Sequence, residues 1–349
     1  MKCLVFLSTF FLCAAIAHAD AVADLEPLLQ QSAAYLDGED VPAAQVLQAQ
    51  RELCRRYVGL DQQQRDAFAQ RLGSALYDAA PGMRVVAGRT LATSCDQADV
   101  ERLLAAMATE PRQNVQHALA RVLGTALRRL PADAGSATRA TAASTLEQLI
   151  RDDTTAPDFR RAMLMSLGNA GAEALPALYR LCDDPRWSRA LHWSLPAALA
   201  GTGSANALDE LILLFETDQA VGFRVACIQA MGTLLARPDS ADQTSVQAAV
   251  GLLRGLVLSG AADPTLKAAA AKACAKWPAA SQDAEFVNAV CRQLKQSTGQ
   301  PCKNYLRALL YLDVELDAET TSFVQAIAAS DQTDPGCRKV AMALLDVDG

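Results

Sequence analysis

Apolar residues recur at three- and four-residue steps along most of this chain, which is the spacing of an α-helix that buries one face. The segment 157–168, PDFRRAMLMSLG, places apolar side chains on one face and Arg160 and Arg161 at its edge. A second apolar stripe runs from Ala174 to Leu181. Gly168 to Gly171 separate the two, and glycine accepts the left-handed conformation that ends helices. The pattern predicts a pair of helices joined by a tight turn.

The same pattern returns along the chain. A Pro or Gly is followed within a few residues by Arg, Lys or Asn and then by an Ala/Leu-rich stretch. The landmarks are Pro81/Arg84, Pro111/Asn114, Pro157/Arg160, Pro185/Arg189, Gly222/Arg224, Pro264/Lys267, Pro301/Asn304 and Pro335/Arg338. Their spacing, about 29 to 46 residues, is typical of a degenerate helix-pair repeat. Second helices are expected at 99–108, 137–151, 205–216, 242–258, 283–296 and 317–329.

These features predict an all-α fold, an α-solenoid of stacked antiparallel helix hairpins. A composition of 51% hydrophobic but only 5% aromatic residues fits a core of Ala and Leu. Asp184, Asp263 and Asp334 each precede a proline, where an Asp side chain can cap the new helix. Two longer loops, 131–137 and 237–243, are expected as insertions at a rim. We expect one repeat domain over residues 20–349.

Residues 159–184, FRRAMLMSLGNAGAEALPALYRLCDD, resemble a HEAT-like repeat of the type also found in phycobilisome lyases. The matching positions are Arg160, Leu167, Gly168, Gly171, Leu175, Pro176, Leu178, Asp183 and Asp184. A copy at 223–235 keeps Arg224, Ala226, Met231 and Gly232 but lacks the second glycine. The resemblance implies a HEAT-like or ARM-type superhelix with a groove. It implies no activity, because scaffolds, adaptors and a few enzymes share the repeat.

The first residues have the features of an export signal. Lys2 is followed by the apolar run Leu4 to Ile16 and by Ala17-His18-Ala19, a small-x-small cleavage site. The apolar run is shorter than the roughly 20 residues that span a bilayer. Lipid anchoring at Cys13 is the alternative, but bulky residues precede it. We expect residues 1–19 to be removed as a signal peptide, and the protein to be secreted or periplasmic, with no stable membrane insertion after cleavage.

Charge limits the partners that this chain can bind. The net charge of −7 weighs against nucleic acid, which needs a basic footprint. No lysine occurs between Lys2 and Lys267, so arginine supplies every cation in that stretch. Biased codon usage in a GC-rich genome explains this, and an arginine-lined recognition face is the alternative.

Eight cysteines follow the signal segment, which in an exported chain permits disulfides. The repeat register makes Cys54–Cys95 and Cys302–Cys337 reasonable bridges, because neighbouring repeats place equivalent positions side by side. A Cys291–Cys302 bridge competes with the second. Cys182, Cys227 and Cys274 lie in apolar helical contexts, where a buried free thiol is common.

No catalytic constellation is evident. His117 and His192 lie far apart and in no metal-ligand spacing, and no Gly-x-Ser-x-Gly elbow or phosphate loop occurs. The paired His-Glu steps of HEAT-like iron hydroxylases are missing. We therefore expect neither a metal nor a cofactor, and no enzymatic activity.

One segment departs from the repeat composition. Two of the three tryptophans lie six residues apart among arginines, in a patch of Tyr179, Arg180, Trp187, Arg189, His192 and Trp193. These residues either fill the core between hairpins or form an interaction hot spot, where Trp, Tyr and Arg are enriched. The acidic residues Asp209, Glu210, Glu216 and Asp218 that follow indicate a solvated helix face.

The sequence thus predicts an exported, non-catalytic scaffold that binds a protein or peptide in its groove. A structural subunit of an envelope or secretion assembly is one alternative. An enzyme or small-ligand carrier with a pocket between hairpins is the other.

Overall fold

The computed structural model describes residues 23–34, 42–93, 96–236 and 243–346, and all regular structure in these ranges is helical. The helices form two compact units, which adjoin in sequence at Arg180 and Leu181. None of the helices in the described ranges combines the length and apolar character needed to cross a membrane. The predicted signal segment, Cys95 and most of the loop 237–243 lie outside the described residues.

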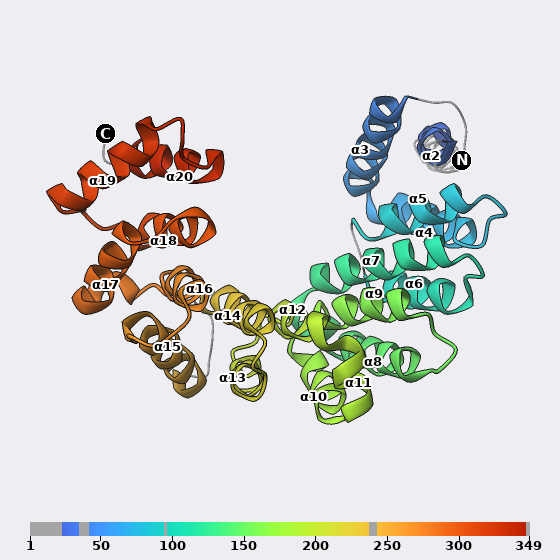
Figure 1. The fold of residues 1–349 in the computed structure, drawn as a ribbon. Helices are drawn as coiled ribbons and strands as arrows, with labels where there is room; N and C mark the ends of the chain where they lie inside the picture. Colours follow the sequence, from blue (N-terminus) through green and yellow to red (C-terminus); the bar gives the residue numbers. More distant parts are fainter. Residues whose placement is uncertain (1–22, 35–41, 94–95, 237–242, 347–349) are drawn as a thin grey trace, which may run out of the picture. The chain divides into compact units, whose positions relative to one another are not determined.

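The first unit consists of consecutive helices joined by short breaks (Figure 1). They are α2 (Glu26–Ala34), α3 (Ala43–Gly59), α4 (Gln62–Ala75), α5 (Pro81–Leu91), α6 (Gln97–Thr109), α7 (Gln113–Arg129), α8 (Ala132–Arg151), α9 (Pro157–Gly168), the 3-10 turn η1 (Gly171–Ala174) and α10 (Leu175–Asp183), whose last residues enter the second unit.

The second unit continues in the same manner (Figure 1). Its elements are α11 (Pro185–Leu191), η2 (His192–Ser194), α12 (Leu195–Gly201), α13 (Ala207–Thr217), α14 (Val221–Leu235), α15 (Gln243–Leu258), α16 (Pro264–Cys274), η3 (Ala280–Gln282), α17 (Ala284–Lys295), α18 (Gly299–Leu312), α19 (Ala318–Ala329) and α20 (Pro335–Asp346).

Each unit has two layers of helices. In the first unit, α5, α7 and α9 pack side by side, while α4, α6 and α8 form a second layer across them. In the second unit, α12, α14, α16, α18 and α20 form one layer, and α13, α15, α17 and α19 form the other. In each unit, we call the layer given first here the first-helix layer and the other the second-helix layer. The expected all-α fold of stacked helix hairpins is confirmed.

The local signals for helix ends are also confirmed. α9 covers the predicted segment, and Gly171 adopts a left-handed φ of 83°. Asp184, Asp263 and Asp334 each accept a backbone N–H at the start of the next helix. Six second helices lie within a few residues of their expected positions, as α6, α8, α13, α15, α17 and α19.

The expected loop at 131–137 is wrong, because α8 begins at Ala132. Pro131 precedes the helix at its N-cap, and its carbonyl accepts the N–H of Gly135. Arg139 donates to the carbonyls of Leu127, Leu130 and Pro131, and so joins the end of α7 to the start of α8. A run of small residues after proline therefore forms the first turns of a helix.

Candidate functional site

The second unit departs from the regular repeat where α11, η2 and α12 replace one continuous first helix. Pro196 lies in the first turn of α12 and has no N–H to donate to the helix before it. His192 and Trp193 lie in η2, at this interruption. The break therefore places two aromatic side chains with polar ring nitrogens, His192 and Trp193, in a short 3-10 turn instead of a regular α-helix.

Three aromatic rings pack against one another at the break. The His192 ring stacks on Phe223 of α14, with centroids 3.7 Å apart and an interplanar angle of 13°. Trp193 meets both rings edge-on, at 5.5 Å from His192 and 5.9 Å from Phe223. Phe223 is fully buried, whereas 64% of Trp193 is exposed. The indole is thus supported from one side and open to solvent on the other.

Asp218 fixes the imidazole of His192. Its Oδ2 lies 3.1 Å from Nε2 of His192, and its Oδ1 accepts the N–H of Ala220 at 2.6 Å. The expectation that Asp218 belongs to a freely solvated face is therefore wrong, because it holds the aromatic cluster at the start of α14.

An open pocket of about 550 Å³ adjoins the cluster and is lined by Arg189, His192, Trp193, Asp218 and Phe223, among others. Arg189 is exposed and makes no ion pair or hydrogen bond with the described residues. An exposed indole beside a free guanidinium offers both apolar contact and a charged donor. Trp and Arg are the residues most enriched at the centres of protein interfaces.

The thiol in this pocket is not activated. Burial raises the pKa of Cys182, and the neighbouring carboxylate of Glu210 raises it further. A thiolate is the nucleophilic form of cysteine, so Cys182 remains protonated and unreactive near neutral pH. The imidazole of His192 is likewise engaged, because its Nε2 contacts Asp218 and its ring packs against Trp193.

The predicted patch divides into residues with different environments. Trp187 is only 3% exposed, and the guanidinium of Arg186 lies 4.6 Å from the centre of its ring. Trp187 therefore occupies the core position that was one of the two readings of the patch. Arg189, His192 and Trp193 lie together at the pocket, as the other reading requires.

Tyr179 and Arg180 belong to the first unit. Arg180 contacts Glu147 of α8 through Nη2, 2.5 Å from Oε2, and through Nε, 3.0 Å from Oε1. Burial opposes ionisation of Glu147, but Arg180 and Arg151 outweigh it and lower its pKa. Arg180 thus joins α10 to α8. Tyr179 is half-buried in α10.

The cysteines expected to form bridges are free thiols wherever they are described. Cys302 and Cys337 lie on the neighbouring helices α18 and α20, close enough for each thiol to affect the pKa of the other, and the Cys337 thiol donates to the carbonyl of Gly299. Cys291 instead contacts Thr320. The contact favours Cys302–Cys337 over Cys291–Cys302, and the bridge itself stays a prediction. Cys54 is half-buried in α3, and its expected partner Cys95 lies outside the described residues.

No family model and no curated protein matches this sequence. Among solved structures, the chain is similar to that of the complex of CpcE and CpcF of phycocyanin lyase from Nostoc sp. PCC7120, with 17% identity over 80% of this chain and 94% of that chain, at a TM-score of 0.38. Kap121p bound to Ste12p shares 12% identity over 88% of this chain and 42% of that one, at a TM-score of 0.42. A structure from work on the interaction between cadherin and beta-catenin shares 14% identity over 88% of this chain and 67% of that one, at a TM-score of 0.34.

Proposed function

We propose that this chain is an exported, non-catalytic helical-repeat scaffold that binds a protein or peptide partner, with Trp193 as an anchor. The observation that carries the proposal is the 64% exposure of an indole held in place by His192 and Phe223. A rigid aromatic side chain loses little conformational entropy on binding, so its burial contributes more of its contact free energy to affinity. Arg189 adds a guanidinium that no described residue neutralises.

The rest of the pocket supports binding in preference to catalysis. Cys182 stays a thiol because burial raises its pKa, and His192 is engaged by Asp218. Among the described residues, no cluster of His, Cys, Asp and Glu could hold a metal ion. Export is supported by the sequence of residues 1–19. Mass spectrometry of the protein from the exporting cell should find Asp20 at its N-terminus, and an intact Met1 would contradict export by cleavage.

Peptide selection on the purified protein tests the anchor directly. Peptides from a displayed random library that bind the chain should bury Trp193, which shifts the tryptophan fluorescence to shorter wavelength and reduces its quenching by acrylamide, and both changes should be absent in Trp193→Ala. Trp193→Ala should weaken binding at least tenfold with little change in melting temperature. Met342→Ala is the matched control, because Met342 is 51% exposed on α20, away from the aromatic cluster.

Equal loss of binding in both variants, or none in Trp193→Ala, would overturn the anchor. Size-exclusion chromatography of native extracts tests the structural-subunit alternative. A free monomer agrees with a scaffold that binds its partner reversibly, whereas a permanent large complex would favour a subunit of an assembly.

A further inference from the structure

A cluster of cations lies on the first-helix layer of the second unit. Lys272 and Lys276 belong to α16 and the residues just after it, and Lys303 and Arg307 belong to the neighbouring helix α18. All four side chains are half-buried. They gather in a chain whose net charge is −7, so the cluster runs against the overall charge.

These cations repel one another and are poorly solvated. Burial lowers the pKa of Lys272, and the charges of Arg307, Lys276 and Lys303 lower it further. Burial also lowers the pKa of Lys276. Lys303 lies near Asp334 and helps to lower the pKa of that carboxyl. Lys272, Lys276 and Arg307 have no acidic partner within ion-pair distance among the described residues.

Two pockets meet at Lys276. The first, of about 200 Å³, is lined by Lys272, Lys276 and the polar side chains of Gln229, Thr233 and Asn304. The second, of about 270 Å³, is lined by Lys276 together with Trp277, Pro278, Tyr311 and Leu312. Lys276 also lies 5.9 Å from the centre of the Tyr311 ring, and Tyr311 is 46% exposed. A basic pocket and an apolar pocket therefore share one wall.

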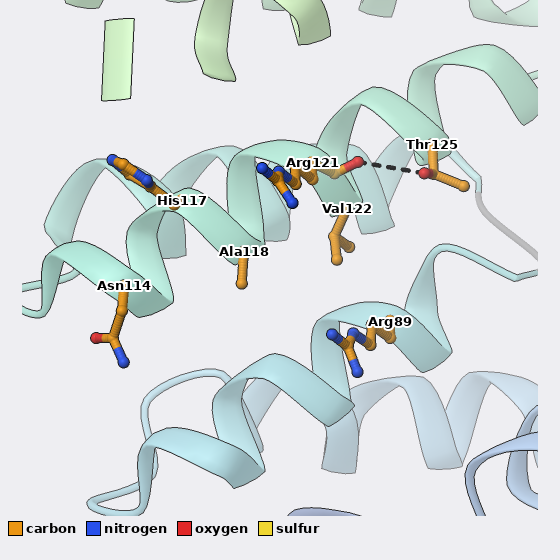
Figure 2. Close-up of a pocket in the computed structure, with 7 residues that line it drawn as sticks. All are labelled: Arg89, Asn114, His117, Ala118, Arg121, Val122 and Thr125. Carbon is orange, nitrogen blue, oxygen red and sulfur yellow. Dashed lines mark hydrogen bonds between the residues drawn. The ribbon is translucent and has the colours of Figure 1, made fainter. Parts of the chain in front are cut away.

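The position of the basic pocket follows from the repeat, because the first unit has a pocket at the equivalent place (Figure 2). Counted from the start of each helix, Arg121 of α7 and Lys272 of α16 are both the ninth residue. The preceding first helix contributes its own ninth residue, Arg89 of α5 or Gln229 of α14. Figure 2 shows Arg89 and Arg121 on the two helices that border this pocket of about 480 Å³. The repeat therefore produces a pocket at this position, and basic side chains line it in both units.

We propose that α16 and α18 bind an acidic peptide segment, whose carboxylates pair with Lys272, Lys276 and Arg307 and whose neighbouring apolar side chain enters the pocket at Trp277 and Tyr311. Charge complementarity selects the carboxylates, because these cations lack counter-charges in the free protein. The apolar pocket beside them selects a peptide in preference to a nucleic-acid backbone, which the net charge of the chain also repels. This site uses different residues from the Trp193 pocket and does not depend on it.

Fluorescence anisotropy with the full chain tests the proposal. The probe is a labelled peptide of about twelve residues with four glutamates around one leucine, and its partner has glutamine at every glutamate. We expect the glutamate peptide to bind, with an affinity that falls as salt is added, and the glutamine peptide not to bind. Replacing the leucine of the peptide by alanine, or Tyr311→Ala in the protein, should weaken binding several-fold.

The double variant Lys272→Glu/Lys276→Glu should lose at least tenfold in affinity. Arg292→Glu/Lys339→Glu is its matched control, with the same change in net charge at two exposed positions of the second unit. If the reversed charges unfold the protein, Lys272→Met/Lys276→Met keeps the aliphatic stems and removes the repulsion. Trp193→Ala should leave the binding of the glutamate peptide unchanged, so this experiment tests the site on α16 and α18 independently of the Trp193 pocket.

Three outcomes would overturn the proposal. The first is an equal loss of affinity in the site variant and its control, which would mean that only the overall charge of the protein attracts the peptide. The second is equal binding of the glutamate and glutamine peptides. The third is tighter binding of an oligothymidine or a phosphopeptide than of the glutamate peptide, which would assign the cluster to phosphate.

Discussion

Arg84 of α5 and Glu110, the residue after α6, form a two-point ion pair that solvent barely reaches. Nε of Arg84 lies 2.6 Å from Oε2 of Glu110, and Nη2 lies 2.9 Å from Oε1. Nη1 donates to the carbonyl of Asp78, in the break before α5, while Oε1 of Glu110 accepts the N–H of Arg112. One landmark arginine thus connects the breaks before α5 and α7.

Removal of this arginine should cost much of the stability of the first unit. Arg84→Ala leaves the carboxylate of Glu110 buried and unpaired, which typically costs about 3–5 kcal/mol. Urea unfolding measures the loss. Arg55→Ala, which breaks an exposed pair with Glu52, is the control and should change the midpoint little. Similar midpoints for the two variants would contradict a structural role for the Arg84–Glu110 pair.

Asp99 of α6 should make stability fall as pH rises. Burial, followed by the charge of Asp96, raises the pKa of Asp99 to about 6 despite the contact with Arg102. The folded state therefore holds this proton more tightly than the unfolded state, whose pKa is about 4. The stabilisation is complete below pH 4 and is lost between about pH 4 and pH 6.

Asp99→Asn should accordingly raise the free energy of unfolding at pH 7, by on the order of 2 kcal/mol relative to its effect at pH 4. Chemical denaturation across this pH range measures the difference. Asp66→Asn, at an exposed position of α4, is the control. A constant difference between Asp99→Asn and the unaltered protein from pH 4 to pH 7 would sink the prediction.

Gly232 sets the approach of α14 to α16. A Cβ atom there would lie 2.6 Å from Cβ and 2.7 Å from Cα of Ala273, so one helix would have to move. Gly232→Ala should therefore destabilise the second unit by about 1–3 kcal/mol. Gly251→Ala in α15 has open space around the new methyl group and should instead stabilise by about 0.5–1 kcal/mol. Thermal melts that show the same sign for both variants would contradict this packing.

Trp187 and Trp193 should respond oppositely to truncation. Trp187→Ala empties a buried site and should cost about 3–5 kcal/mol. Trp193→Ala, at a 64% exposed site, should change the melting temperature little and act on peptide binding. A large loss of stability in Trp193→Ala would show that the indole serves the fold.

Cys302 and Cys337 should form the bridge that the register predicts. Oxidation with glutathione disulfide, followed by peptide mapping, should recover a Cys302–Cys337 pair and raise stability by about 2–4 kcal/mol. Burial raises the pKa of Cys337 to about 12, so the exchange should be slow at neutral pH and faster in alkali. Cys337→Ser is the control, and recovery of a Cys291–Cys302 pair instead would refute the assignment.

Local signals made most of the fold predictable. An Asp before Pro fixes a helix start from adjacent residues alone, and the bounds of α9 follow from Pro157 at one end and Gly168 at the other. The partners of the landmark residues were not predictable, because they lie in other breaks or other repeats. Glu110 is such a partner, and in α7 it is Gln116, not Asn114, that donates to the preceding helix, at the carbonyl of Met107 in the last turn of α6.

The candidate sites were predictable in part for the same reason. The unusual composition around Trp193 is visible in the sequence, but its separation from the buried Trp187 depends on the break at η2. Nothing in the sequence singles out Lys272 and Arg307, because only the side-by-side packing of α16 and α18 makes them neighbours.

The layered packing also has a consequence for how the chain can acquire its structure. Within each unit, a first helix packs on the neighbouring first helices and on the second helices next to it in the sequence, so most of its contacts are with nearby segments of the chain. Chains with such short-range contacts fold rapidly. A chain delivered gradually through a narrow channel, N-terminus first, could add one hairpin to the last as each emerged and would never expose a long unprotected apolar stretch.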